Sequence, residues 1–246
     1  MPKGLRVQIS PRAPTLKFMN RPRVNSNFFK NWSCDMAYIL GFIVTDGCLV
    51  EHKNGYHALN ITNKNKEILQ AILREMGSNH KISIKSRGGT PNLKYFQIQI
   101  RDKILYSDLL KLGLTPRKSK TVTMPSVPPK FFADFARGCF DGDGGVSYWK
   151  EPRWKHSWQI RTTFASGSKK FLVALKSLLH KYAGIRLGKI WSRKSGHELH
   201  YGIRDSVTFY NYIYKDTPDL YLKRKKDSFE YFNKLKFAFS EFGPIV

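Results

Sequence analysis

The chain has little cysteine, few acidic residues and no long apolar run, and each shortage excludes a class of protein. Only 3 of its 246 residues are Cys. Their spacing fits neither a zinc site nor a disulfide framework, which favours reduced thiols. No apolar run approaches the length of a membrane span, and no secretory signal is visible. We therefore expect a folded intracellular protein of the cytoplasm, the nucleoid or an organelle matrix, with no membrane partner.

Acidic residues are outnumbered by basic ones. The chain has 18 Asp and Glu against 43 Lys and Arg, which gives a net charge of +25 at pH 7. The basic residues occur throughout the chain, interleaved with strand-like sequence, and not in a single tail. Such a surface attracts a polyanion, and nucleic acid is the leading candidate partner. An anionic membrane is disfavoured because the sequence contains no basic amphipathic helix with an apolar face left exposed.

Two stretches of the chain repeat one pattern. Residues 39–47 read ILGFIVTDG and residues 136–144 read ARGCFDGDG, so each is a helix-like run that closes on Asp-Gly. In both, small residues recur at four-residue spacing. On a helix, this spacing makes a flat stripe where a second backbone can approach closely. The stripe residues are Gly41 and Thr45 in the first copy and Gly138 and Gly142 in the second.

An acidic residue lies at the end of each copy, Asp46 in the first and Asp143 in the second. A Gly after the last helical turn is a common cap, but a cap does not require an acid before it. If the two helices pack stripe to stripe, the carboxylates meet at the C-terminal ends. That end of a helix is negative, so we expect positive groups nearby. A carboxylate pair held in this way predicts a divalent-metal site.

The duplication extends beyond the two motifs. After each motif we expect a turn and then strands and helices in the same order, with both sets of strands closing on Ile-Arg-Asp. The sequence predicts an α+β fold of two pseudo-symmetric αββαββα halves packed through the motif helices, at 33–124 and 125–246, behind a basic arm at 1–32. The predicted strands are 57–62, 80–86, 94–101, 157–165, 187–193 and 198–204, and the predicted helices are 66–76, 105–112, 169–182 and 207–214.

Alternation along the predicted strands assigns their two faces. Phe96, Ile98 and Ile100 form part of one apolar face, as does Ile84, and this face should pack on helices. The other face carries long donors and amides with almost no carboxylates, and such side chains read base edges in a major groove. The candidate base contacts are Asn60, Lys85, Gln97, Gln99 and Arg101 in the first half and Gln159, Arg161, Lys189, Arg193 and Arg204 in the second.

The repeated motifs resemble those of the LAGLIDADG homing endonucleases, in the form that carries two motifs in one chain. The second motif is close to the family's usual wording, whereas Val44 in the first stands where an acid is common. The resemblance covers about residues 33–240. It implies a monomer whose sheets form a saddle on double-stranded DNA, and which cuts both strands of a long asymmetric site by metal-dependent hydrolysis, leaving 3′ overhangs.

The resemblance also implies roles for single residues. Asp46 and Asp143 would bind the divalent ions, with the backbone carbonyls of Thr45 and Gly142 as further ligands. The expected ion is Mg²⁺, for which Mn²⁺ would substitute, while Ca²⁺ would support binding with little cleavage. The lysines expected near the cut phosphates are Lys118 and Lys225, although Arg117, Lys120, Arg224 and Lys226 leave the register open. The polar residues expected to complete a water network are Asn63 and Ser166.

Two other functions share this fold. An intron maturase would bind intron RNA, and basic strands do not distinguish RNA from DNA. A DNA-binding regulator without catalysis would have the same surface. Because both terminal acids are retained, we expect the nuclease.

Overall fold

The structure is a computed structural model that describes residues 22–52, 54–86, 94–153, 157–216 and 218–240. Most of the expected basic arm therefore lies outside the described residues. From residue 22 onward the chain packs on the first half. Phe29 is buried in the core, and the hydroxyl of Ser26 donates a hydrogen bond to Asp102 over 2.6 Å.

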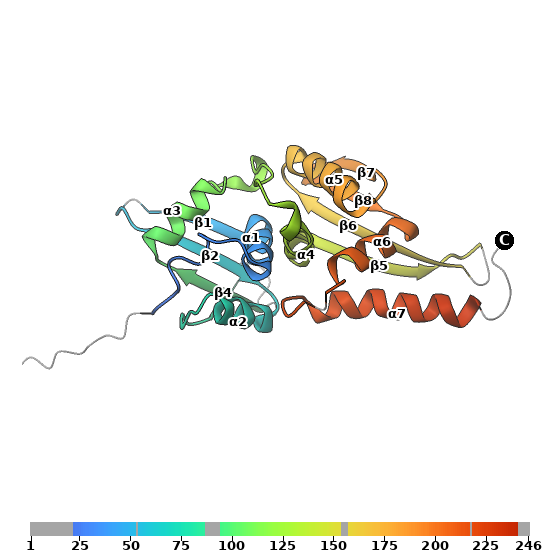
Figure 1. The fold of residues 1–246 in the computed structure, drawn as a ribbon, viewed down its shortest axis with the longest axis horizontal. Coiled ribbons are helices and arrows are strands. Elements are labelled where there is room, and N and C mark those ends of the chain that lie inside the picture. The colour runs from blue at the N-terminus through green and yellow to red at the C-terminus, as the bar shows by residue number, and fades with distance from the viewer. Residues whose placement is uncertain (1–21, 53, 87–93, 154–156, 217, 241–246) are drawn as a thin grey trace, which may run out of the picture.

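Each half follows the predicted αββαββα order (Figure 1). The first half contains α1 (Cys34–Asp46), β1 (Gly47–Glu51), β2 (His57–Asn63), α2 (Lys66–Glu75), β3 (Ser83–Ser86), β4 (Lys94–Ile100) and α3 (Lys103–Lys111). The second contains α4 (Phe132–Asp143), β5 (Gly144–Lys150), β6 (Trp158–Ser166), α5 (Lys169–Ala183), β7 (Lys189–Arg193), β8 (Gly196–Tyr201) and α6 (Ile203–Ile213). Two short 3-10 helices, η1 (Lys118–Lys120) and η2 (Pro129–Phe131), lie between the halves, and α7 (Lys223–Ser240) follows the second.

Strands β1 and β5 begin directly after the motif helices, where the sequence predicts a turn. Gly47 and Gly144 both have extended backbones, with φ of −89° and −85°. They do not form a left-handed cap. A Cβ at Gly47 would lie 2.6 Å from the carbonyl oxygen of Ile43, so glycine is needed here for space. The chain therefore passes from helix to strand without a loop, and each acid stands at that junction.

The two sheets are antiparallel and have matching strand orders, β1-β2-β4-β3 and β5-β6-β8-β7. In the first sheet Ile61 pairs with Ile98, and both are buried against the helices, as the alternation predicts. Ile84 is an exception, because its residue is 65% exposed. It lies on the edge strand β3, which pairs only with β4, so the predicted inward packing of Ile84 is wrong.

The halves pack through α1 and α4, which lie side by side at the centre of the molecule (Figure 1). The predicted stripe explains how closely they approach. A Cβ at Gly41 would overlap the carbonyl oxygen of Phe135, and one at Gly138 would overlap that of Tyr38. Two backbones are therefore in contact where the glycines face each other. One apolar core extends across this interface into both halves.

The Ile-Arg-Asp tripeptides occupy different positions in the two halves. In the first, Ile100 ends β4 and the side chain of Asp102 caps α3 by accepting from the backbone N–H of Leu105. In the second, β8 already ends at Tyr201, and 203–205 form the first turn of α6. Arg204 is therefore a helix residue and not part of the predicted strand. Gly202, just before it, is where strand gives way to helix.

Candidate functional site

The last residues of the two motif helices lie close together. The charge of Asp143 acts on Asp46 and contributes to raising its pKa. Asp46 is half-buried, and its Oδ2 accepts a hydrogen bond of 2.5 Å from the amide of Asn63, at the end of β2. Asp143 is exposed to solvent. The acids from the two halves thus form one pair that water and ions can reach.

Ionising both carboxylates of the pair is unfavourable when no cation is bound. Burial, followed by the charge of Asp143, raises the pKa of Asp46 to about 6. Surrounding protein also raises the pKa of Asp143, although its side chain keeps contact with solvent. The positive charges of Lys118 and Lys225 act in the opposite direction on both acids. Two carboxylates that lose solvation and repel each other are a setting in which a bound divalent cation is stabilising.

Both lysines expected near the site are buried and bind the ends of the motif helices. The ammonium of Lys118 donates to the carbonyl of Val44 over 2.6 Å. That of Lys225 donates to the carbonyls of Phe140, Asp141 and Gly144. Burial lowers the pKa of Lys118 and lowers that of Lys225 to about 8. These ammonium groups are the positive charges expected at the negative ends of the helices.

Lys118 is held by a segment that crosses from the first half to the second. Arg117, just before it, has a left-handed backbone with φ of 57°, which is rare for a residue other than glycine. A Cβ at Gly167 would overlap the carbonyl oxygen of Ser119, so the two backbones touch at the β6–α5 turn. The second half therefore helps to position Lys118, which binds the end of α1 in the first half.

Lys225 is held by a buried polar network that has no counterpart among the described residues of the first half. Asp141 is fully buried, and its Oδ2 accepts from the hydroxyl of Tyr38 over 2.9 Å and from the backbone N–H of Leu222 over 2.8 Å. Tyr38 belongs to α1, whereas Leu222 leads into α7. The carboxylate thus ties α1, α4 and the start of α7 together. At the matching place in the first motif, Val44 has no polar side chain.

A small cavity of about 150 Å³ opens beside the acids. Its lining includes Thr45, Lys118, Asp143 and Ser166. Unlike Asn63, Ser166 has no hydrogen bond to its neighbouring acid among the described residues; its hydroxyl accepts from the backbone of Ser168. Lys118 and Lys225 do not bond to either expected carbonyl ligand, that of Thr45 or that of Gly142. Within the described ranges, no three His, Cys, Asp or Glu side chains cluster as a metal site.

The open face of the first sheet carries a connected set of neutral amides. The amide of Gln99 donates to Asn60 over 3.1 Å, and its carbonyl accepts from Arg101, also over 3.1 Å. The guanidinium of Arg101, just beyond the end of β4, lies 4.4 Å from the ring of Tyr56. Gln97 shares this face, as does the exposed Lys85 on β3. The structure thus brings all five first-half candidates to one surface.

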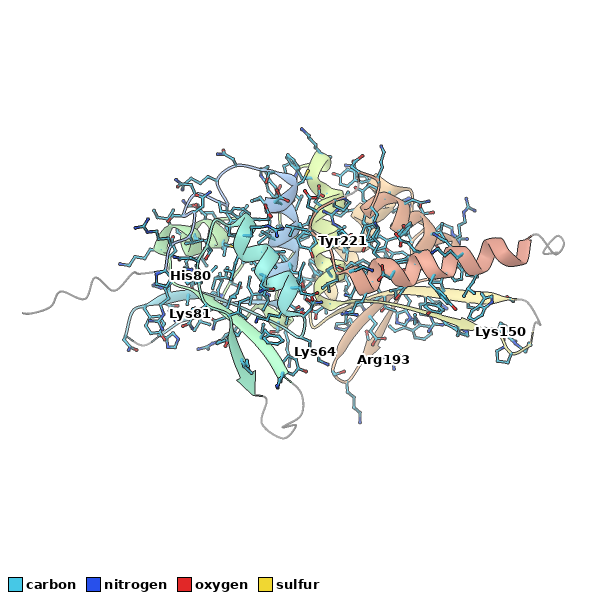
Figure 2. All side chains as sticks on the ribbon, turned by 90° about the horizontal axis from the view of Figure 1, so that it is seen from below. Lys64, His80, Lys81, Lys150, Arg193 and Tyr221 are labelled. Carbon is cyan, nitrogen blue, oxygen red and sulfur yellow. The ribbon has the colours of Figure 1, made fainter. Side chains whose placement is uncertain are left out.

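The open face of the second sheet carries cations against indole rings. Arg161 lies 5.0 Å from the ring of Trp149, and Lys189 lies 5.3 Å from that of Trp191. Arg193 lies at the lower side of the molecule in Figure 2. The pairing places Gln159 on the same face as Trp149. Of the five second-half candidates, Arg204 alone lies elsewhere, on α6.

Residues 33–120 match the model of the LAGLIDADG-like domain family. This chain contains a LAGLIDADG-like domain. The resemblance stated from the two motifs is confirmed. A comparison with curated protein sequences gave no significant match. Within the described ranges no helix has both the length and the apolar character needed to cross a membrane.

Several solved structures share the fold of this chain. The homing endonuclease I-WcaI, bound to its DNA recognition sequence, aligns with a TM-score of 0.57 at 15% identity, covering 89% of this chain and 94% of that one. I-DmoI in complex with DNA and Mn aligns with a TM-score of 0.52 at 18% identity, covering 76% and 100%. Full-length DUF199/WhiA from Thermatoga maritima aligns with a TM-score of 0.52 at 13% identity, covering 90% and 66%. At these identities the likeness shows the two-domain LAGLIDADG fold and not the activity.

Sequence reasoning assigned no role to three groups that the structure brings into this region. Asp141 lies within the second motif, and its absence from the first motif is the signal that marks it. Tyr38, its partner, reads simply as an apolar helix residue. Glu198 lies on the open face of the second sheet, which the sequence predicts to be almost free of carboxylates. Its contact with Arg193, on the neighbouring strand, depends on the register of β7 on β8.

Proposed function

We propose that this protein is a site-specific homing endonuclease that uses divalent metal ions, most simply Mg²⁺, to cut both strands of a long asymmetric DNA site and leave 3′ overhangs. The observation that carries the proposal is the pair of acids, Asp46 and Asp143. They come from different halves, meet at the C-terminal ends of α1 and α4, and remain accessible to solvent.

The donor set near this pair suits Mg²⁺, which prefers carboxylate, carbonyl and water ligands. Asp46 and Asp143 would hold the ions, and the carbonyls of Thr45 and Gly142 would be further ligands. When bound, the ions would activate water and offset charge on the leaving oxygen. I-DmoI, which has this fold, has been crystallised with DNA and Mn.

The remaining residues orient the acids. Asn63 donates to Asp46 and restricts the rotation of that carboxylate. Lys118 and Lys225 hold the helix ends and supply positive charge near the phosphates. We propose that Ser166 contacts a water in the neighbouring cavity. DNA would lie along the open faces of both sheets, where the candidate base contacts gather, and the unlike halves would read an asymmetric site without a second copy of the chain.

The test uses the full chain and a pool of genomic or random duplexes, from which cleaved DNA is recovered and sequenced. The parent should cut both strands with Mg²⁺, and should bind its selected site with little cutting when Ca²⁺ replaces Mg²⁺. Asp46→Asn and Asp143→Asn should each reduce cleavage by at least about 100-fold while retaining much of the binding. Variants that cut at the parental rate would overturn the assignment.

A DNA-binding protein without catalysis is the second candidate, because WhiA shares the fold to a similar degree. It predicts binding without cleavage in every metal. An intron maturase predicts binding to structured RNA that competing DNA duplex does not displace. Affinity measured for both nucleic acids, over a range of salt concentrations, separates these outcomes from the nuclease. For the nuclease, DNA affinity should fall steeply as salt rises.

A further inference from the structure

A carboxylate lies among the cations on the open face of the second sheet. In β8, Glu198 pairs with Ala165 on one side and with Trp191 on the other, which places all three on the face opposite the core. An acid here faces the same way as the candidate base contacts. DNA phosphates would repel this carboxylate, so its place on this face requires a favourable interaction that offsets the repulsion.

The carboxylate is held from two sides. Nε of Arg193 donates to Oε2 of Glu198 over 3.1 Å, and Nε2 of His200 lies 2.9 Å from the same oxygen. Arg193 comes from β7, whereas His200 comes from β8 itself. The bond therefore fixes an arginine on the edge strand against a central strand of the sheet.

The geometry leaves the other end of the arginine available. Because the bond to Glu198 is made through Nε, it does not use the edge of the guanidinium formed by the two Nη groups. The side chain of Arg193 is 62% exposed, against 34% for Glu198, so a ligand on this face meets the arginine first. A guanidinium that presents two donors in a fixed plane matches O6 and N7 of guanine.

We infer that Glu198 is a specificity-determining residue, which orients Arg193 to read guanine in the major groove. This inference rests on the proposed DNA-binding function. A cavity of about 190 Å³ is lined by Glu198 and Arg193 and also by Asp143. The base read by Arg193 would therefore lie next to the cleavage centre, on the side of the second half. Glu198 acts through the arginine and is a positioning residue.

The test is a binding selection from randomised duplexes in Ca²⁺, with the parent and with Glu198→Gln, Arg193→Lys and the double variant. The parent should require guanine at one or two neighbouring positions. Both single variants should relax the same positions about five-fold or more. The double variant should relax them no further than Arg193→Lys alone, because the two residues act as a unit.

A matched control is available on the helical side of the first half. In α2, Nε of Arg74 donates to Glu75 over 3.0 Å, which is the same pair with nearly the same geometry. Glu75→Gln removes the same charge and should leave every base preference unchanged. Thermal unfolding of all variants checks that each remains folded.

Three results would overturn the inference. If Glu198→Gln converts a cytosine preference into adenine, the carboxylate itself reads the base. If it tightens binding to all duplexes and leaves preferences intact, the acid only weakens non-specific affinity. If the parent selects no duplex at all, the proposed function fails, and this inference fails with it.

Discussion

The two halves of this protein have the same fold and hold their acids differently. In the first, Asp46 is bonded to Asn63, and one lysine binds one carbonyl of the motif helix. In the second, no amide among the described residues is bonded to Asp143, and Lys225 binds three carbonyls above a buried carboxylate network. The common part is what brings the acids together. The hydrogen bonds around each acid differ, so each half positions its own acid with a different set of side chains.

The largest effect should come from the feature that the halves share most closely. Gly41→Val and Gly138→Val should each lower the free energy of unfolding by about 3 kcal/mol or more, because each new side chain would overlap a carbonyl oxygen of the other helix. Denaturant unfolding measures this. Gly202→Ala is the control, since nothing lies within 4 Å of its Cβ. A loss confined to one of the two valine variants would break the pseudo-symmetry.

The acid pair should make stability depend on pH. The pKa of Asp46 rises from 3.8 to about 6 on folding, so the native state binds its proton more tightly. The contribution of Asp46 to the stability of the parent should therefore fall by about 3 kcal/mol as pH rises from about 4 to about 6. Asp46→Asn cannot ionise and should be more stable than the parent at neutral pH without metal.

Unfolding in a chelating buffer across this pH range tests the pH dependence. The difference between parent and Asp46→Asn should shrink toward zero below about pH 4, where both side chains are neutral. Adding Mg²⁺ at neutral pH should stabilise the parent and leave the variant much less affected. A difference that is constant with pH would contradict the assigned charge state.

The lysines provide a smaller contrast. Lys225→Met should cost about 1–2 kcal/mol more stability than Lys118→Met, because it removes hydrogen bonds to three carbonyls and not to one. Denaturant midpoints of the two variants measure the difference. Equal losses would mean that the halves hold their helix ends equally well.

The smallest effect on stability should come from the open faces. Gln97 pairs with Thr62, one residue before Asn63, just as Glu198 pairs with Ala165, one residue before Ser166. Gln97→Glu gives the first half an acid without its arginine and should change stability by no more than about 0.5 kcal/mol. DNA affinity should fall, and the loss should shrink at high salt. Affinity that stays unchanged at low salt would argue against DNA on this face.

Sequence alone was sufficient for the repeated architecture, because it is encoded locally. The motif stripes specify a helix pair, and the alternation in 94–100 specifies which side of a strand is buried. The approach of Asp46 to Asp143 also followed, since both stand at the ends of helices whose glycines must face each other. The excess of basic residues also predicted a cationic surface, because that prediction does not depend on which segments contact each other.

The remainder depends on contacts between distant segments. Nothing near Lys225 in the sequence indicates that its ammonium ends on carbonyls of 140–144. The partnership of Asp141 with Tyr38 crosses from one half to the other. The end of β8 depended on a single Gly202, so Arg204 was assigned to a strand although it lies on a helix. The pairing of Glu198 with Arg193 required the register of β7 on β8.

The segment that carries Lys118 limits how such a molecule can be recombined. Its backbone touches the turn at Gly167, and the hydroxyl of Ser168 donates to the carbonyl of Val122 over 2.7 Å. A chimera that joins this first half to a foreign second half would need a glycine and a hydroxyl at those two places. Without them the segment that positions Lys118 would lose its contacts with the second half. The exchange would then weaken the bond between Lys118 and α1, in the half that had not been replaced.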